Sequence, residues 1–187
     1  RLFLGSNNGH FYVCELSGKY LQIKECHNFC IYNSSNGEYT LKSVDFISED
    51  DIDGSSISIA SKDGSIGIIT KINDKKSKLQ VFPPLPFNSC LGMSANNYSS
   101  NSINFYEFYP NDQDFVMIAT TQSTFLFSTR KGVLIPFVPV LNCKFICLQN
   151  SSKDTIIIGD GLSISVWKLI NKSLKRSSIT NLPGKLN

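Results

Sequence analysis

A chain of 187 residues is long enough to form one domain with a substantial buried core. Its hydrophobic content of 41% and charged content of 18% are typical of soluble globular proteins, and no apolar run approaches the roughly 20 residues of a membrane-spanning helix. A net charge of +3 is small, so composition alone indicates neither a nucleic-acid binder nor a protein with an acidic ligand, and we expect no membrane partner. Six cysteines are too few for a disulfide-stapled scaffold, so we expect an intracellular protein, cytoplasmic or nuclear.

Short apolar or alternating runs typical of β-strands recur along the chain, whereas long runs with helical periodicity are hard to find. The expected strands are 1–4, 10–16, 20–25, 41–47, 56–60, 65–72, 78–82, 103–109, 114–119, 124–128, 133–138, 143–149, 155–158, 163–170 and 173–179. They group into units at about 1–26, 41–82, 103–138 and 143–180, with long inserts at 27–40 and 83–102. The first unit lacks an opening strand, and the chain starts inside a strand at Arg1. We therefore expect a single all-β domain or a fragment of one.

A polar turn joins two apolar strands at the same place in every unit. The four turns are Gly5–Gly9, Ser61–Gly64, Thr120–Ser123 and Gly159–Leu162. Asn8-Gly9 and Asp63-Gly64 in these turns are strong hairpin signals, because these residue types tolerate a positive φ. A repeated hairpin of this kind predicts the blades of a β-propeller, each a sheet of four antiparallel strands.

Several stretches also resemble the blade pattern of the WD-repeat β-propellers. These stretches are Ser43–Phe46 with Ile59–Ile66, Phe105–Asn111 and Ser163–Leu169. No Trp-Asp dipeptide occurs, and Trp167-Lys168 is the nearest approach, so the resemblance is to a degenerate member of the family. It implies about four blades of a larger, seven-bladed ring that binds peptides or protein domains. The remaining blades could lie on a longer chain or on another subunit, or four blades could close by borrowing a strand for the first unit.

Residues with catalytic or metal-binding chemistry are sparse. The two histidines, His10 and His27, belong to no motif that supplies a nucleophile and an orienting acid. Cys26, His27 and Cys30 could ligate zinc, but their spacing does not match a structural zinc site, and a strand end followed by a loop is the better interpretation. The acidic stretch 49–54 lacks the glutamate that would complete a calcium loop and is expected to be a solvated hairpin loop. We expect no enzymatic activity, no cofactor and no metal.

The inserts and the turns are the candidate protein-binding surface. Aromatic residues on loops above a rigid scaffold make good anchors for a partner. The candidate contacts are Phe29, Tyr32, Phe87 and Tyr98 in the inserts and Asn8, Lys62 and Gln122 on the turns. An insert could instead fold over its blade as a lid or be partly disordered. These features favour a non-catalytic protein-interaction scaffold that works in an intracellular complex.

Two basic stretches support an alternative function. Lys75 and Lys76 precede one outer strand, and Lys175 and Arg176 lie on another. Such patches could attract phosphate groups, although neither carries the interleaved aromatic residues of a single-strand binding platform. Charged outer strands also protect a blade edge from pairing with other chains. The alternative is therefore a propeller associated with RNA or a ribonucleoprotein.

Overall fold

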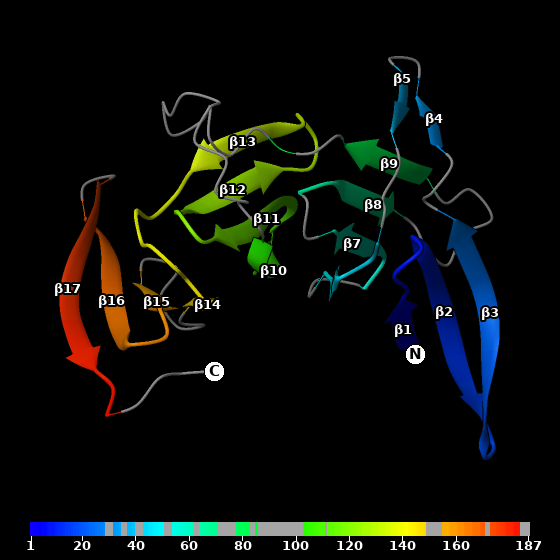
Figure 1. Ribbon diagram of the computed structural model, residues 1–187, viewed down its shortest axis with the longest axis horizontal. Coiled ribbons are helices and arrows are strands. Elements are labelled where there is room, and N and C mark those ends of the chain that lie inside the picture. The colour runs from blue at the N-terminus through cyan, green and yellow to red at the C-terminus, as the bar shows by residue number, and fades with distance from the viewer. Residues whose placement is uncertain are drawn as a thin grey trace. The chain divides into compact units, whose positions relative to one another are not determined.

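The computed structural model is made of β-strands and turns (Figure 1). It describes residues 1–28, 32–34, 37–39, 43–50, 54–61, 64–70, 78–82, 85, 103–110, 112–148, 155–170 and 173–183. The described residues form four antiparallel sheets of three or four strands and one separate two-stranded hairpin, and they contain no helix. This confirms the predicted all-β fold class with its blade-like sheets.

The chain divides into two compact units, residues 1–86 with 106–113, and residues 87–105 with 114–187. The first sheet belongs to the first unit and has the strand order β1 (Leu2–Gly5), β2 (His10–Ser17) and β3 (Tyr20–Asn28). The predicted first unit of three strands is thus observed. One side of this sheet buries Phe11 and Val13 and half-buries Phe3.

The second sheet also lies in the first unit. Its strands, in spatial order, are β6 (Phe46–Glu49), β7 (Ser56–Ala60), β8 (Ile66–Thr70) and β9 (Lys78–Phe82). Ile57, Ile59 and Ile69 are fully buried and form one apolar cluster with Phe11 and Val13 of the first sheet. Because β-strand side chains alternate between faces, this cluster joins one face of the second sheet to one face of the first.

The other face of the second sheet is covered by β10 (Ile103–Tyr109), whose residues 106–109 belong to the same unit. The buried Tyr106 hydroxyl is hydrogen-bonded to the Ser58 hydroxyl on β7. The backbone N–H of Phe108 donates to the Ser48 hydroxyl at 2.9 Å. Both faces of the second sheet are therefore packed within the first unit.

The remaining two sheets repeat the same meander. The third has the order β10, β11 (Asp112–Thr120), β12 (Thr124–Ser128) and β13 (Val133–Pro136). The fourth has the order β14 (Phe145–Leu148), β15 (Thr155–Gly159), β16 (Ser163–Ile170) and β17 (Ser173–Asn181). The inner strand β11 buries five consecutive residues, Val116 to Thr120, on both of its faces, whereas in β15 the half-buried Ile157 lies between the buried Ile156 and Ile158.

Some strand boundaries differ from those expected from the sequence. The opening strand of the second sheet begins at Phe46 rather than at residue 41. β13 ends at Pro136, where the next two residues both pair with Thr124: the Thr124 carbonyl accepts from the Phe137 N–H at 2.9 Å, and the Thr124 N–H donates to the Val138 carbonyl at 3.2 Å. The Thr124 hydroxyl adds two hydrogen bonds with the Val138 backbone, each at 2.8 Å. β14 begins only at Phe145, since Asn142 adopts a positive φ of 52° that interrupts an extended chain.

The insert at 27–40 also contains structure that the sequence did not predict. β3 continues into it as far as Asn28, and β4 (Tyr32–Ser34) pairs with β5 (Gly37–Tyr39) as a short hairpin. Most of the insert at 83–102 lies outside the described residues.

Candidate interaction surface

The four predicted turns share one backbone arrangement. In each, the N–H of the first turn residue donates to the carbonyl of the residue that closes the turn. The four hydrogen bonds run from Ser6 to His10 at 2.9 Å, from Ser61 to Ser65 at 3.0 Å, from Thr120 to Ser123 at 2.9 Å and from Asp160 to Ser163 at 3.2 Å. The first two turns are one residue longer, and Gly9 and Gly64 supply the positive φ that this requires.

Side chains at the first turn position hold three of these turns rigid. The Thr120 hydroxyl accepts from the N–H groups of Gln122 at 3.2 Å and Ser123 at 3.3 Å. The Asp160 carboxylate accepts from the N–H groups of Leu162 at 2.9 Å and Ser163 at 2.7 Å. Slight burial raises the pKa of this carboxyl group, but the hydrogen bonds outweigh it and lower the net pKa.

In the first turn the cap is a small polar network. The Ser6 hydroxyl is hydrogen-bonded to the Asn8 side-chain oxygen, and the same oxygen lies 3.0 Å from Nδ1 of His10. The His10 ring in turn stacks on Tyr12 with 6.1 Å between ring centroids. The local role of His10 is therefore to fix the turn and present Asn8.

Each turn is also tied to the connection that follows its sheet. The Val44 N–H donates to the Ser6 carbonyl at 2.8 Å, and the Leu85 N–H donates to the Gly64 carbonyl at 3.1 Å. In the second unit the Asn142 N–H donates to the Thr121 carbonyl at 2.9 Å. Turns and connections consequently lie at the same end of their sheets, where the two inserts also begin or end.

The residues predicted as protein contacts are described only in part. Asn8 is exposed and Gln122 is half-buried, each on its turn as expected. Tyr32 lies on β4, where the structure describes the backbone only. Phe29, Lys62, Phe87 and Tyr98 lie outside the described residues.

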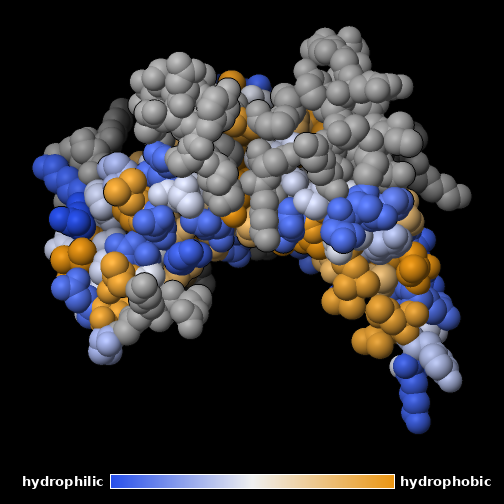
Figure 2. All heavy atoms as spheres, in the orientation of Figure 1, coloured by the Kyte–Doolittle hydropathy of each residue, from blue (hydrophilic) through white to orange (hydrophobic). Residues whose placement is uncertain are grey.

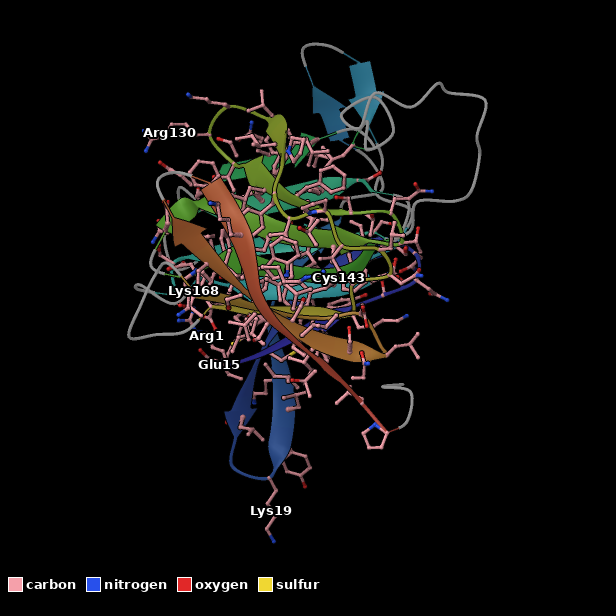
Figure 3. All side chains as sticks on the ribbon, turned by 90° about the vertical axis from the view of Figure 1, so that its left-hand side faces the viewer. Arg1, Glu15, Lys19, Arg130, Cys143 and Lys168 are labelled. Carbon is pink, nitrogen blue, oxygen red and sulfur yellow. The ribbon has the colours of Figure 1, made fainter. Side chains whose placement is uncertain are left out.

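The alternative basic surface is partly visible on the last sheet. Lys175 and Arg176 are exposed on β17, and the Arg176 guanidinium lies 6.0 Å from the centroid of the Trp167 ring. Lys168 on β16 (labelled in Figure 3) is the strand partner of Lys175, so two like charges face each other. Lys75 and Lys76 lie outside the described residues.

Two other stretches considered in the sequence have structural roles. His27 lies 3.0 Å from the Glu25 carboxylate, and no described residues form a cluster of three metal-ligating side chains. The expectation of a solvated acidic loop was wrong for Asp50, which is buried. Its carboxylate accepts from the Ser56 N–H at 2.6 Å and from the Gln113 side chain at 3.1 Å, and so it caps the start of β7.

Sequence reasoning missed an exposed apolar face on the first sheet. Figure 2 shows apolar side chains gathered over β1–β3. They belong to Leu2, Leu4, Leu16, Leu21 and Ile23, which are 41% to 79% exposed. A signal was present in β1, where Leu2, Phe3 and Leu4 are all apolar, because a strand with one solvated face alternates instead. A hollow of about 530 Å³ lies at the edge of this face and is lined by Arg1, Leu2, Glu15, Leu16 and Leu21.

Comparison with known proteins gives no family assignment. No protein-family model matches the chain, and no curated protein is similar to it in sequence at a significant level. Among the described residues, no helix has the length and apolar character needed to span a membrane.

Proposed function

We propose that this chain is a non-catalytic protein-interaction scaffold of an intracellular complex, built from degenerate WD-like propeller blades. The observation that carries the proposal is the set of hydrogen bonds between each turn and the following connection. They run from Val44 to Ser6, from Leu85 to Gly64, from Asn142 to Thr121 and from Leu182 to Leu162. A surface whose loops are fixed to rigid sheets loses little conformational entropy when it binds a partner.

The mechanism is rigid display. The sheets bury the apolar faces of their inner strands, and the capped turns hold side chains such as Asn8 and Gln122 at one end of each sheet. The inserts, which leave from the same end, supply the aromatic anchors Phe29, Tyr32 and Phe87 in this proposal. The partner is a peptide or a protein domain.

Co-purification from cells with quantitative mass spectrometry tests this function. We expect Asn8→Ala and Gln122→Ala to lose the same proteins. Gln122→Ala should keep the melting temperature, whereas Asn8→Ala should lower it by a few degrees, because it also removes the oxygen that caps the first turn. Lys19→Ala is the matched control, because Lys19 lies in the exposed turn at the opposite end of the first sheet, as Figure 3 shows. Equal recovery of every protein by all three variants would refute a binding role for the turns.

An RNA-associated function is the second candidate, favoured by the basic surface on β16 and β17. Lys168 opposite Lys175 is a like-charge pair, which lowers the stability of the sheet. Such a destabilising pair is better tolerated where the two charges bind a ligand. Titration with single-stranded RNA at several salt concentrations tests it. If phosphate contacts carry binding, affinity falls steeply with salt, and the Lys175→Ala/Arg176→Ala double variant has a shallower slope. Binding that is insensitive to salt would exclude this candidate.

A further inference from the structure

Aligning the four sheets on their shared turn separates two kinds of face. We count residues back from the one whose N–H donates the turn hydrogen bond, which is Ser6, Ser61, Thr120 or Asp160. We define the A face as the one that carries the second and fourth residues before this donor. The B face carries the first and third. On the A face the second residue before this donor is Leu4, Ile59, Ile118 or Ile158, and the fourth is Leu2, Ile57, Val116 or Ile156.

These equivalent A-face residues are all aliphatic, but their burial differs sharply. In the last three sheets their side chains are between 0% and 3% exposed, as shown by Ile57, Val116 and Ile156. In the first sheet Leu2 is 46% exposed and Leu4 is 41% exposed. The A face of the first sheet therefore has the usual aliphatic composition but is exposed at Leu2 and Leu4, although Cys14 between them and β3 is buried.

The first unit shows what an A face binds. Ile57 and Ile59 on the A face of the second sheet pack in one cluster with Phe11, which lies on the B face of the first sheet opposite Gly5. Phe3, a further B-face residue, is partly buried against the same cluster. In this molecule an A face is thus a binding site for the B face of another sheet.

The fourth sheet carries an open B face. Ile157, Ile164 and Val166 alternate with buried residues of the A face and are half-buried, and Cys147, the strand partner of Ile157, is exposed. Phe145 completes this face, and its ring lies over Gly159. By contrast, the B-face residues Phe11 and Val13 of the first sheet are 0% and 4% exposed. Among the residues that the structure describes, the first sheet therefore has an open A face and the last sheet an open B face.

We propose that two copies of this chain associate head to tail, the A face of the first sheet of one copy docking on the B face of the last sheet of the other. Within the first unit, the A face of the second sheet packs on the B face of the first sheet. The proposed contact is the same kind of packing, formed between two copies. It joins different surfaces of the two molecules, so it either closes into a ring or continues as a chain of copies. Exposure of apolar surface to water is unfavourable, and the contact would bury both faces. The proposal does not rest on the scaffold function.

Sedimentation velocity of the 187-residue chain over a range of concentrations tests the proposal. We expect the mass to rise from the 20.8 kDa monomer to at least twice that value. Ile23→Asp places a charge on the open A face, where Ile23 is 63% exposed, and Cys147→Asp does the same on the open B face. Each variant should weaken association by at least about tenfold, because the charge would be buried in the contact. Leu141→Asp, 66% exposed in the connection before β14, is the control and should associate like the wild type.

Mixing the two variants gives the decisive result. Ile23→Asp has a damaged A face and Cys147→Asp has a damaged B face, so neither variant can associate with itself. In an equimolar mixture, the intact B face of Ile23→Asp can pair with the intact A face of Cys147→Asp. We expect the mixture to recover a dimer. A wild-type chain that stays monomeric at all soluble concentrations overturns the proposal, as does a mixture that stays monomeric. Circular dichroism melting establishes that each variant is folded, and Leu16→Asp and Ile164→Asp replace any variant that is not.

Discussion

The buried hydrogen bond between Tyr106 and Ser58 gives the sharpest test of how β10 packs on the second sheet. Tyr106 is 6% exposed and Ser58 is 0% exposed, and the Tyr106 hydroxyl has one further acceptor, the Ile59 carbonyl at 3.5 Å. Tyr106→Phe removes the phenol hydroxyl and leaves the Ser58 hydroxyl buried without this partner. We expect the free energy of unfolding to fall by about 1–3 kcal/mol, the usual cost of an unsatisfied buried polar group.

A double-mutant cycle separates this hydrogen bond from general packing effects. Ser58→Ala should cost a similar amount, because it leaves the phenol hydroxyl with only the long contact to Ile59. The double variant removes both hydroxyls and should cost less than the sum of the single variants, by about 1–2 kcal/mol. The assay is urea unfolding followed by circular dichroism and fluorescence. If the losses of unfolding free energy in the two single variants add to that of the double variant within about 0.5 kcal/mol, the hydrogen bond between Tyr106 and Ser58 is refuted.

The same residue makes a prediction about pH. Burial raises the pKa of the Tyr106 hydroxyl above the ordinary tyrosine value of 10.0, and the hydrogen bond with Ser58 only partly offsets this. The folded state then keeps the phenol neutral at a pH where the unfolded chain ionises. The neutral phenol of Tyr106 makes its full contribution to the free energy of unfolding below about pH 10. This contribution is lost as the pH rises through the folded-state pKa. Tyr106→Phe should therefore lose less stability above pH 10 than the wild type does.

Three further changes probe other parts of the fold. Gly5→Ala should destabilise by about 1–3 kcal/mol in urea unfolding, because a Cβ atom would lie 2.6 Å from the Val44 backbone oxygen; an unchanged midpoint would contradict that close approach. Phe11→Ala should cost about 3–5 kcal/mol, since the side chain is fully buried in the cluster between the first two sheets; a cost below about 1 kcal/mol would show that this cluster does not form. Exposed Cys147 should react with a maleimide at neutral pH much faster than Cys143, whose thiol is buried with its pKa raised to about 12, and peptide mass spectrometry would reveal equal rates if that burial were wrong.

Local sequence signals predicted the turns and most inner strands because their causes are local. Asn8-Gly9 forms its hairpin turn since glycine accepts the positive φ of 77° observed there. Strand ends were less predictable, because they depend on contacts with distant residues. β13, for example, ends where Phe137 and Val138 both form hydrogen bonds with Thr124, a residue of the preceding strand.

The candidate surface could be anticipated only in outline. Turn position and residue type indicated that Asn8 and Gln122 would be presented at the ends of sheets, and their placement follows from local hydrogen bonds. The exposed A face of the first sheet could not be located in the same way. Leu4 and Ile59 are equivalent aliphatic residues in equivalent strands, and only the three-dimensional packing shows that one is 41% exposed and the other 0%.

Site-specific photocrosslinking in cells tests the interaction-scaffold proposal most directly. A photoreactive amino acid placed at Asn8 or at Gln122 lies on a capped turn, and one at Arg176 lies on the exposed outer strand of the last sheet. The scaffold function predicts discrete protein adducts from both turn positions and none from position 176. Adducts with RNA at position 176, with no protein adduct at either turn, would contradict it and favour the nucleic-acid alternative.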